Sequence, residues 1–210
     1  MGIAIAGCLA GSAAPVLIEC PFGRWSRTDV FDWLRLELPA DTLVGVDLSP
    51  SLPFADCGAF FPGWGASPPD AKTLWKLIDD ICADDAHLAA TSFVRHDSAR
   101  EHFRHGKGDC GKFFPAGGGR LRLTERRQAE QDQSPSSCFN LVGAAQVGKS
   151  SLTGMRVFNR LAGQIPIWPF DALPETGSAI VEIYTSIAAR RAGIRKGRSK
   201  MTDGDALDAA

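Results

Sequence analysis

The sequence predicts an α/β fold in which a mixed sheet is flanked by helices. Near the start, apolar runs precede and follow a helical pattern, and this strand–helix–strand order is typical of an α/β layer. Residues 42–46 form an apolar run that leads to Asp47 and then breaks into Ser and Pro, as a buried strand does at its carboxyl end. A second such run covers 178–184. Open α/β sheets bind ligands at the carboxyl ends of strands, so Asp47 is the first candidate site residue.

The composition is that of an ordinary globular protein. The 210 residues are 44% hydrophobic and 22% charged, with a formal net charge of -1. This length suffices for one domain, with or without an insertion. The balanced charge means that a nucleic acid or membrane partner would need a local patch. No run approaches the roughly 20 apolar residues of a membrane span.

The cysteines and the start of the chain indicate a cytoplasmic protein. The six cysteines are scattered and include no C-x-x-C pair, which fits reduced thiols better than a disulfide framework. The short apolar run before Cys8 has no basic stretch ahead of it, so we expect no signal peptide.

The first fifty residues predict a hairpin, a helix and the strand that ends at Asp47. The apolar runs 2–8 and 16–20 are separated by a loop of small residues, which predicts a hairpin. Ser26 or Thr28 can cap a helix that continues to Leu38, because Pro39 cannot extend it.

Residues 50–135 predict a loop-rich helical insertion. Residues 50–69 are rich in Pro, Gly and aromatic side chains, which indicates either a functional loop or one attached to the core by its aromatic rings. A helix is expected from Pro69 or Asp70 to Cys82, and a weaker one over 88–103. Residues 117–135 indicate a charged, solvated connector rather than a binding arm.

The insertion also contains side chains of metal-ligating types. These are His102, His105, Asp109 and Cys110, and no pair with zinc-finger spacing accompanies them. We expect an exposed polar loop there, with a metal site as the alternative.

Residues 143–150 match the phosphate-binding pattern G-x-x-x-x-G-K-S. In a P-loop, the backbone from Gly143 to Gly148 would surround phosphates, Lys149 would contact the outer phosphates, and Ser150 would bind Mg²⁺. Too few residues follow Ser150 for the further βα units of a nucleotide-binding core, and the best apolar run ending in Asp precedes the motif. P-loop-type nucleotide binding is therefore the alternative function.

The last third predicts two strands and a second candidate carboxylate. Residues 165–171 contain two prolines and predict an edge strand. The run 178–184 carries Glu182 between apolar residues, where a carboxylate is costly unless it is paired, binds metal or faces outward.

The final residues contain the densest basic run and a third carboxylate. Asp208 lies in a short helix that is expected to start near Asp203. The basic run could bind a phosphodiester backbone, or it could be the solvated end of a helix. Its members are Arg190, Arg191, Arg195, Lys196, Arg198 and Lys200.

Four short motifs follow one another in an informative order. They are V-G-V-D-L-S-P at 44–50, W-P-F at 168–170, V-E-I-Y at 181–184 and A-L-D-A at 206–209. Together they resemble an uncharacterised bacterial family of the ribonuclease-H-like superfamily, which is related to predicted nucleases and Holliday-junction resolvases. Residues 143–156 also resemble a Gly-rich segment of that family, which argues against a true P-loop.

This resemblance implies a single ribonuclease-H-like domain over 1–210, with 50–135 as an insertion. It also implies that the domain cleaves phosphodiesters with divalent metal ions. Asp47, Glu182 and Asp208 would be the catalytic residues and the ligands of Mg²⁺ or Mn²⁺. The family layout also has a leading strand with an Asp, and none precedes Ile3. We therefore expect a domain shortened at both ends, and an inactive scaffold that binds nucleic acid or a partner stays open.

Overall fold

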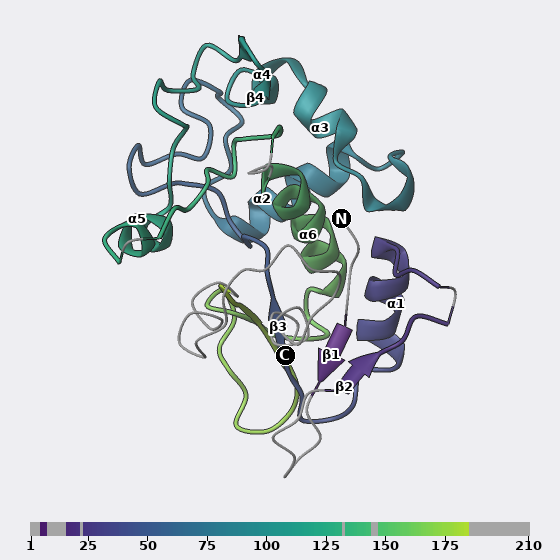
Figure 1. Ribbon diagram of the computed structural model, residues 1–210. Helices are drawn as coiled ribbons and strands as arrows, with labels where there is room; N and C mark the ends of the chain where they lie inside the picture. The colour runs from purple at the N-terminus through teal and green to yellow at the C-terminus, as the bar shows by residue number, and fades with distance from the viewer. Residues whose placement is uncertain (1–4, 8–15, 22, 132, 144–146, 185–210) are drawn as a thin grey trace. The chain divides into compact units, whose positions relative to one another are not determined.

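The computed structural model describes residues 5–7, 16–21, 23–131, 133–143 and 147–184, which fold into two compact units. Unit 1 comprises residues 1–47 and 163–210, and unit 2 comprises residues 48–162. Unit 2 is thus one continuous segment inserted between the two parts of unit 1, and the expected insertion over 50–135 lies within it. The described chain is mixed α/β, with a small parallel sheet and several helices (Figure 1).

Unit 1 contains one helix, one hairpin and a small parallel sheet. The hairpin pairs β1 (Ile5–Gly7) with β2 (Val16–Ile18) antiparallel, as the sequence predicts for the described parts of these runs. The sheet has the order β3-β7-β6, and both pairs of neighbours are parallel. Its strands are β3 (Leu43–Val46), β6 (Ile167–Trp168) and β7 (Ala179–Glu182). The Pro-containing segment therefore forms an edge strand, β6, as predicted.

Helix α1 (Arg27–Leu36) begins at a reciprocal cap. The backbone N–H of Asp29 donates to Ser26 Oγ over 3.1 Å, and the Ser26 N–H donates to Asp29 Oδ2 over 2.8 Å. Two N–H groups that the helix itself leaves unpaired are thereby satisfied. The prediction of Ser26 as a cap is confirmed, and the helix ends two residues before the expected Leu38.

Strand β3 is not the buried strand that its apolar run predicts. Its residues alternate between exposed and half-buried, and Leu43 is 68% exposed. Among the described strands β3 pairs only with β7, whereas β7 lies between β3 and β6 and buries Ala179 and Ile180. The apolar run therefore lies at the margin of the described sheet and not at its centre.

Unit 2 is built mainly from helices and loops. Its elements are α2 (Ala71–Ile81), η1 (Ala86–Leu88), α3 (Thr91–Arg95), α4 (Asp97–Arg100), β4 (Arg104–Gly106), β5 (Asp109–Cys110), α5 (Leu123–Ala129) and α6 (Val147–Leu161). Helices α2 and α6 pack side by side through apolar faces, and the rings of Trp75 and Phe158 have centroids 5.5 Å apart (Figure 1). The fully buried Arg156 joins the same two helices through Nε, which lies 2.8 Å from Asp79 Oδ1. This helix pair is one half of the core of unit 2.

A cluster of aromatic rings forms the other half of that core. Phe61 is fully buried, and its ring centroid lies 5.7 Å from that of Phe93 and 6.0 Å from that of Phe139. Phe61 belongs to the aromatic-rich loop 50–69, which also packs on itself, since the Phe54 and Phe60 centroids are 4.9 Å apart. The aromatic side chains thus attach this loop to the core, as one of the two interpretations of the sequence requires.

Two expectations within unit 2 are wrong. The weak helix expected over 88–103 is two short helices, α3 and α4, because His96 adopts φ −59° and ψ 131°, which interrupts the helical path. The expectation of a solvated connector over 117–135 is wrong for Arg120, because its side chain is only 9% exposed and is tied to the loop 50–69. The guanidinium donates to both carboxylate oxygens of Asp56 and to backbone carbonyls of that loop, at Pro53, Ala59 and Phe60.

No helix in the described part of the chain has the length and apolar character needed to cross a membrane.

Candidate carboxylate site

The pairing of β3 with β7 brings two of the candidate acids to one edge of the sheet. The strands are parallel and in register, with Val46 opposite Glu182, and the Ile183 N–H donates to the Val46 carbonyl over 3.0 Å. Asp47 is the next residue after Val46, so both acids stand at the carboxyl ends of neighbouring parallel strands. This is the edge at which α/β sheets bind ligands.

The register is fixed at the opposite end of the two strands. The Thr42 N–H donates to Ser178 Oγ over 3.1 Å, and the Ala179 N–H donates to the Thr42 carbonyl over 3.1 Å. Asp41 has a φ of 53°, and its Oδ1 accepts from the Gly177 N–H. These contacts start both strands at the same level, so Val46 and Glu182 finish at the same level.

A glycine within β3 permits close packing next to the acids. A Cβ on Gly45 would lie 2.9 Å from Ile183 Cγ2, closer than side chains normally approach. Ile183 directly follows Glu182, so the absence of a side chain on Gly45 leaves room for the Ile183 side chain beside β3. The glycine of the V-G-V-D motif therefore has a steric role beside the candidate site.

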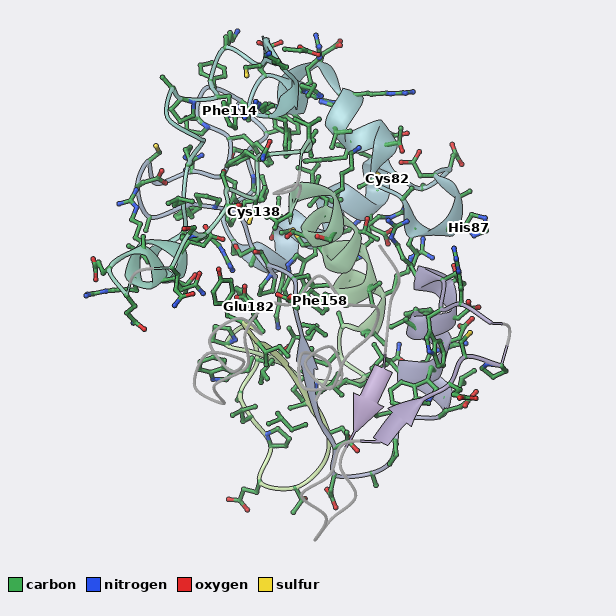
Figure 2. The ribbon with its side chains drawn as sticks, in the orientation of Figure 1. Cys82, His87, Phe114, Cys138, Phe158 and Glu182 are labelled. Carbon is green, nitrogen blue, oxygen red and sulfur yellow. The ribbon has the colours of Figure 1, made fainter. Side chains whose placement is uncertain are left out.

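The two acids differ in their surroundings. Asp47 is exposed and lies in the bend that follows β3. Glu182, labelled in Figure 2, is half-buried at the end of β7. Val46 and Glu182 are register partners and therefore share a face of the sheet, whereas strand alternation would place the next position, Asp47, on the opposite face if the bend at Asp47 did not end the strand. Another acid of unit 1, Asp171, has a structural contact, because its Oδ2 accepts from the Ile167 N–H over 3.0 Å. Asp47 and Glu182 are the two predicted site residues that the structure describes at the ends of these strands.

The third expected ligand, Asp208, lies outside the described residues, as does the whole basic run from Arg190 to Lys200. Within the residues that are described, no three His, Cys, Asp or Glu side chains are grouped so that they could hold a metal ion. The structure thus places two of the three predicted ligands and leaves the third as a prediction.

The alternative metal site in the insertion is divided between the core and the surface. His102 is 2% exposed, and its ring stacks on Phe113 with centroids 4.8 Å apart. Burial lowers the pKa of His102 to about 4, so the ring is neutral at pH 7. His105 Nε2 lies 3.0 Å from the Arg100 carbonyl, and Asp109 and Cys110 are exposed in β5. The expectation of an exposed polar loop is therefore wrong for His102, which is a core residue.

The geometry at the G-x-x-x-x-G-K-S sequence argues against a P-loop. The Gly148 N–H donates to the Asn140 carbonyl over 3.1 Å, so this amide is not available to a phosphate. A Cβ on Gly148 would lie 2.4 Å from the Cys138 carbonyl oxygen, which gives the glycine a packing role. The Ser150 hydroxyl donates to the Val147 carbonyl within the first turn of α6. A P-loop follows a strand, whereas the described residues 139–142 form only an isolated bridge between Asn140 and Arg104.

Comparisons of the chain with protein-family models, with curated proteins and with solved structures gave no match.

Proposed function

We propose that unit 1 binds a divalent metal ion at the carboxyl ends of β3 and β7 and uses it to hydrolyse phosphodiesters, in a ribonuclease-H-like arrangement of strands. The observation that carries the proposal is the in-register parallel pairing of Val46 with Glu182, which brings Asp47 and Glu182 to one edge of the sheet. Asp208 would add a third carboxylate from the end of the chain.

The donor set suits the metal ions that such a reaction uses. Carboxylate oxygens are hard ligands that prefer Mg²⁺ or Mn²⁺ to softer ions. When bound, the ion would polarise the phosphoryl oxygens and favour attack by water. Asp47 and Glu182 would hold the ion, and their exposed and half-buried positions leave the edge open to a polymeric substrate.

The first test is metal binding. Mn²⁺ affinity is measured by calorimetry or paramagnetic resonance for the full chain and for Asp47→Asn and Glu182→Gln. Each variant should bind Mn²⁺ about tenfold more weakly or worse, because each loses a charged ligand. Glu175→Gln is the matched control, since Glu175 is an exposed acid of the same unit away from the strand ends. Equal affinity in all four proteins would remove the proposed metal site.

The second test is cleavage. Single-stranded DNA, duplex DNA, a branched junction and RNA are incubated with the full chain and Mg²⁺ or Mn²⁺. The proposal expects cleavage of at least one substrate that is lost in Glu182→Gln and kept in Glu175→Gln. Metal binding without any cleavage would leave the site in place and favour the inactive scaffold, which is then tested by salt-dependent nucleic acid binding.

A further inference from the structure

Unit 2 contains a pocket that is separate from the carboxylate site and carries a positive charge. Its volume is about 250 Å³, and it lies between the glycine run Gly117–Gly119 and the segment Ser136–Asn140. Arg104 of β4 lines it, and none of its lining residues is acidic. The lining therefore has one full positive charge and no negative charge to oppose it.

The walls of this pocket are held in place by contacts on several sides. Arg104 is hydrogen-bonded to the segment across the pocket, since its N–H donates to the Phe139 carbonyl over 2.9 Å and its carbonyl accepts from the Leu141 N–H over 3.1 Å. The Ser137 hydroxyl donates to the Arg120 carbonyl over 2.6 Å. A Cβ on Gly119 would lie 2.7 Å from Ser137 Oγ, so the glycine run packs directly on that segment. A ligand would thus meet a largely preformed site, which lowers the entropic cost of binding.

The residues that line the pocket include several hydrogen-bond donors. Arg104 makes no ion pair with any described residue, and its side chain has only a long contact, 3.5 Å from Nε to the Gly106 carbonyl. Among the described backbone hydrogen bonds, none uses the N–H groups of Gly117, Gly118 or Gly119. All three glycines have φ between 92° and 117°, a region that side chains other than glycine rarely adopt. The hydroxyl of Ser136 adds a further donor.

We propose that this pocket binds a phosphate group, either as free phosphate or as the head of a phosphate monoester. A planar guanidinium with backbone amides and a hydroxyl is the donor set that recognises tetrahedral oxyanions. The volume is slightly below the roughly 300 Å³ at which pockets for whole organic ligands begin, so the site suits a compact charged group. Neither Asp47 nor Glu182 lines this pocket. The phosphate proposal and the metal proposal can therefore be tested independently of each other.

The test uses the full chain labelled with ¹⁵N and two probes, inorganic phosphate and adenosine monophosphate. The amide signals of Gly117, Gly118 and Gly119 should shift on titration, with saturation and with weaker affinity at higher salt. Saturation with both probes shows recognition of the phosphate group, and tighter binding of the monoester shows that the rest of the molecule contributes. No shift of these amides with either probe would overturn the proposal.

A matched pair of variants at one position tests the electrostatic argument. Ser136→Asp places a carboxylate in the lining, whereas Ser136→Asn has nearly the same shape and no charge. We expect Ser136→Asp to weaken phosphate binding at least tenfold relative to Ser136→Asn. Arg104→Gln should weaken it by a similar factor, and Arg95→Gln, which alters an exposed arginine outside the pocket, should not. Equal affinity for Ser136→Asp and Ser136→Asn, with both proteins folded by circular dichroism, would overturn the proposal even if Arg104→Gln does not fold.

Discussion

His102 is a titratable ring surrounded by other rings in the core of unit 2. The rings of Phe61 and Phe113 have centroids 5.3 Å and 4.8 Å from it, and neither of its ring nitrogens has a hydrogen-bond partner among the described residues. A charged imidazolium there would lose its hydration without gaining a partner. The neutral form is therefore the one that the folded protein accommodates.

The protein should lose stability on mild acidification because of this residue. The pKa of His102 falls from 6.5 to about 4 on folding, so between these pH values the unfolded chain takes up a proton that the folded chain does not. The stability that the neutral His102 ring provides is therefore fully present above pH 6.5 and is lost as the pH falls towards 4. The loss should be on the order of 2–3 kcal/mol, measured by urea unfolding across this pH range.

The variant His102→Phe should flatten this dependence, whereas His105→Gln should keep it. Asp56 contributes in a different window, because the Arg120 hydrogen bonds lower the pKa of that carboxyl below 3.8. Its contribution is lost only as the pH falls below that value. A wild-type slope in His102→Phe between pH 6.5 and 4 would contradict the assignment to His102.

Arg120 holds the aromatic-rich loop by contacts that a lysine cannot reproduce. Lysine has three donors on a single nitrogen, whereas the arginine fork reaches Asp56 and carbonyls on several sides at once. Arg120→Lys should therefore lower the free energy of unfolding by about 2–4 kcal/mol, because buried partners are left unpaired. Arg127→Lys is the control, since the Arg127 side chain is 79% exposed, and should change stability by less than about 0.5 kcal/mol. Similar urea midpoints for the two variants would contradict this role.

Among the helices, the start of α6 depends on backbone contact at Gly148. The space for a Cβ is occupied by the Cys138 and Asn140 carbonyl oxygens, and backbone cannot move aside as a side chain can. Gly148→Ala should lower stability by about 1–3 kcal/mol. Gly154→Ala meets only the Leu48 side chain and should cost less, and Lys149→Ala, at an exposed position, should have little effect on unfolding.

The same three variants separate the two interpretations of the G-x-x-x-x-G-K-S sequence. A P-loop predicts that Lys149→Ala abolishes nucleotide binding, measured by calorimetry with ATP or GTP. A structural turn predicts no nucleotide binding in the wild type, the largest stability loss in Gly148→Ala and almost none in Lys149→Ala. The hydrogen bond from Gly148 to Asn140 favours the structural turn.

Elements with a local signal could be predicted from the sequence. Helices α1 and α2 were predicted from candidate start residues, Ser26 and Asp70, and from the apolar faces that follow them. Both residues cap their helices in the structure. Helix α5 could not be predicted in this way, because its one buried residue, Glu125, is held by Arg122 rather than by an apolar face. The burial of Arg120 depends on a partner 64 residues away, which no local pattern contains.

The candidate site, too, could be predicted from local patterns but not in its long-range contacts. The apolar run before Asp47 placed this acid at a strand end, whereas the run 178–184 placed Glu182 inside a strand, and the structure ends β7 at Glu182. Their pairing is a long-range property, because a run of apolar residues specifies neither the neighbour of a strand nor its position in the sheet. For this reason the sequence predicted a buried strand over 42–46, whereas in the described sheet β7 lies between β3 and β6. Asp208 stays a prediction.

At the scale of the whole molecule, the two units differ in how their cores are built. The largest fully buried side chains, from Trp75 and Phe61 to Met155, all belong to unit 2. The parallel sheet of unit 1 has strands of two to four residues, and β3 is half exposed. Amides of α2 and α6 should therefore exchange with deuterium more slowly than those of β3 and β7. The exchange is measured by mass spectrometry or NMR. Amides of β3 and β7 that exchange as slowly as those of α2 and α6, or more slowly, would contradict this difference.

The nesting of unit 2 within unit 1 has a consequence for synthesis on the ribosome. Thr42 and Ser178, whose hydrogen bond starts the pairing of β3 with β7, are 136 residues apart in the sequence. All of unit 2, residues 48–162, is synthesised between them. Closing so long a loop is slow compared with local folding, so the inserted unit forms first and the acids meet last. A chain that ends before residue 178 contains all of unit 2 but lacks β7, so β3 has no strand to pair with.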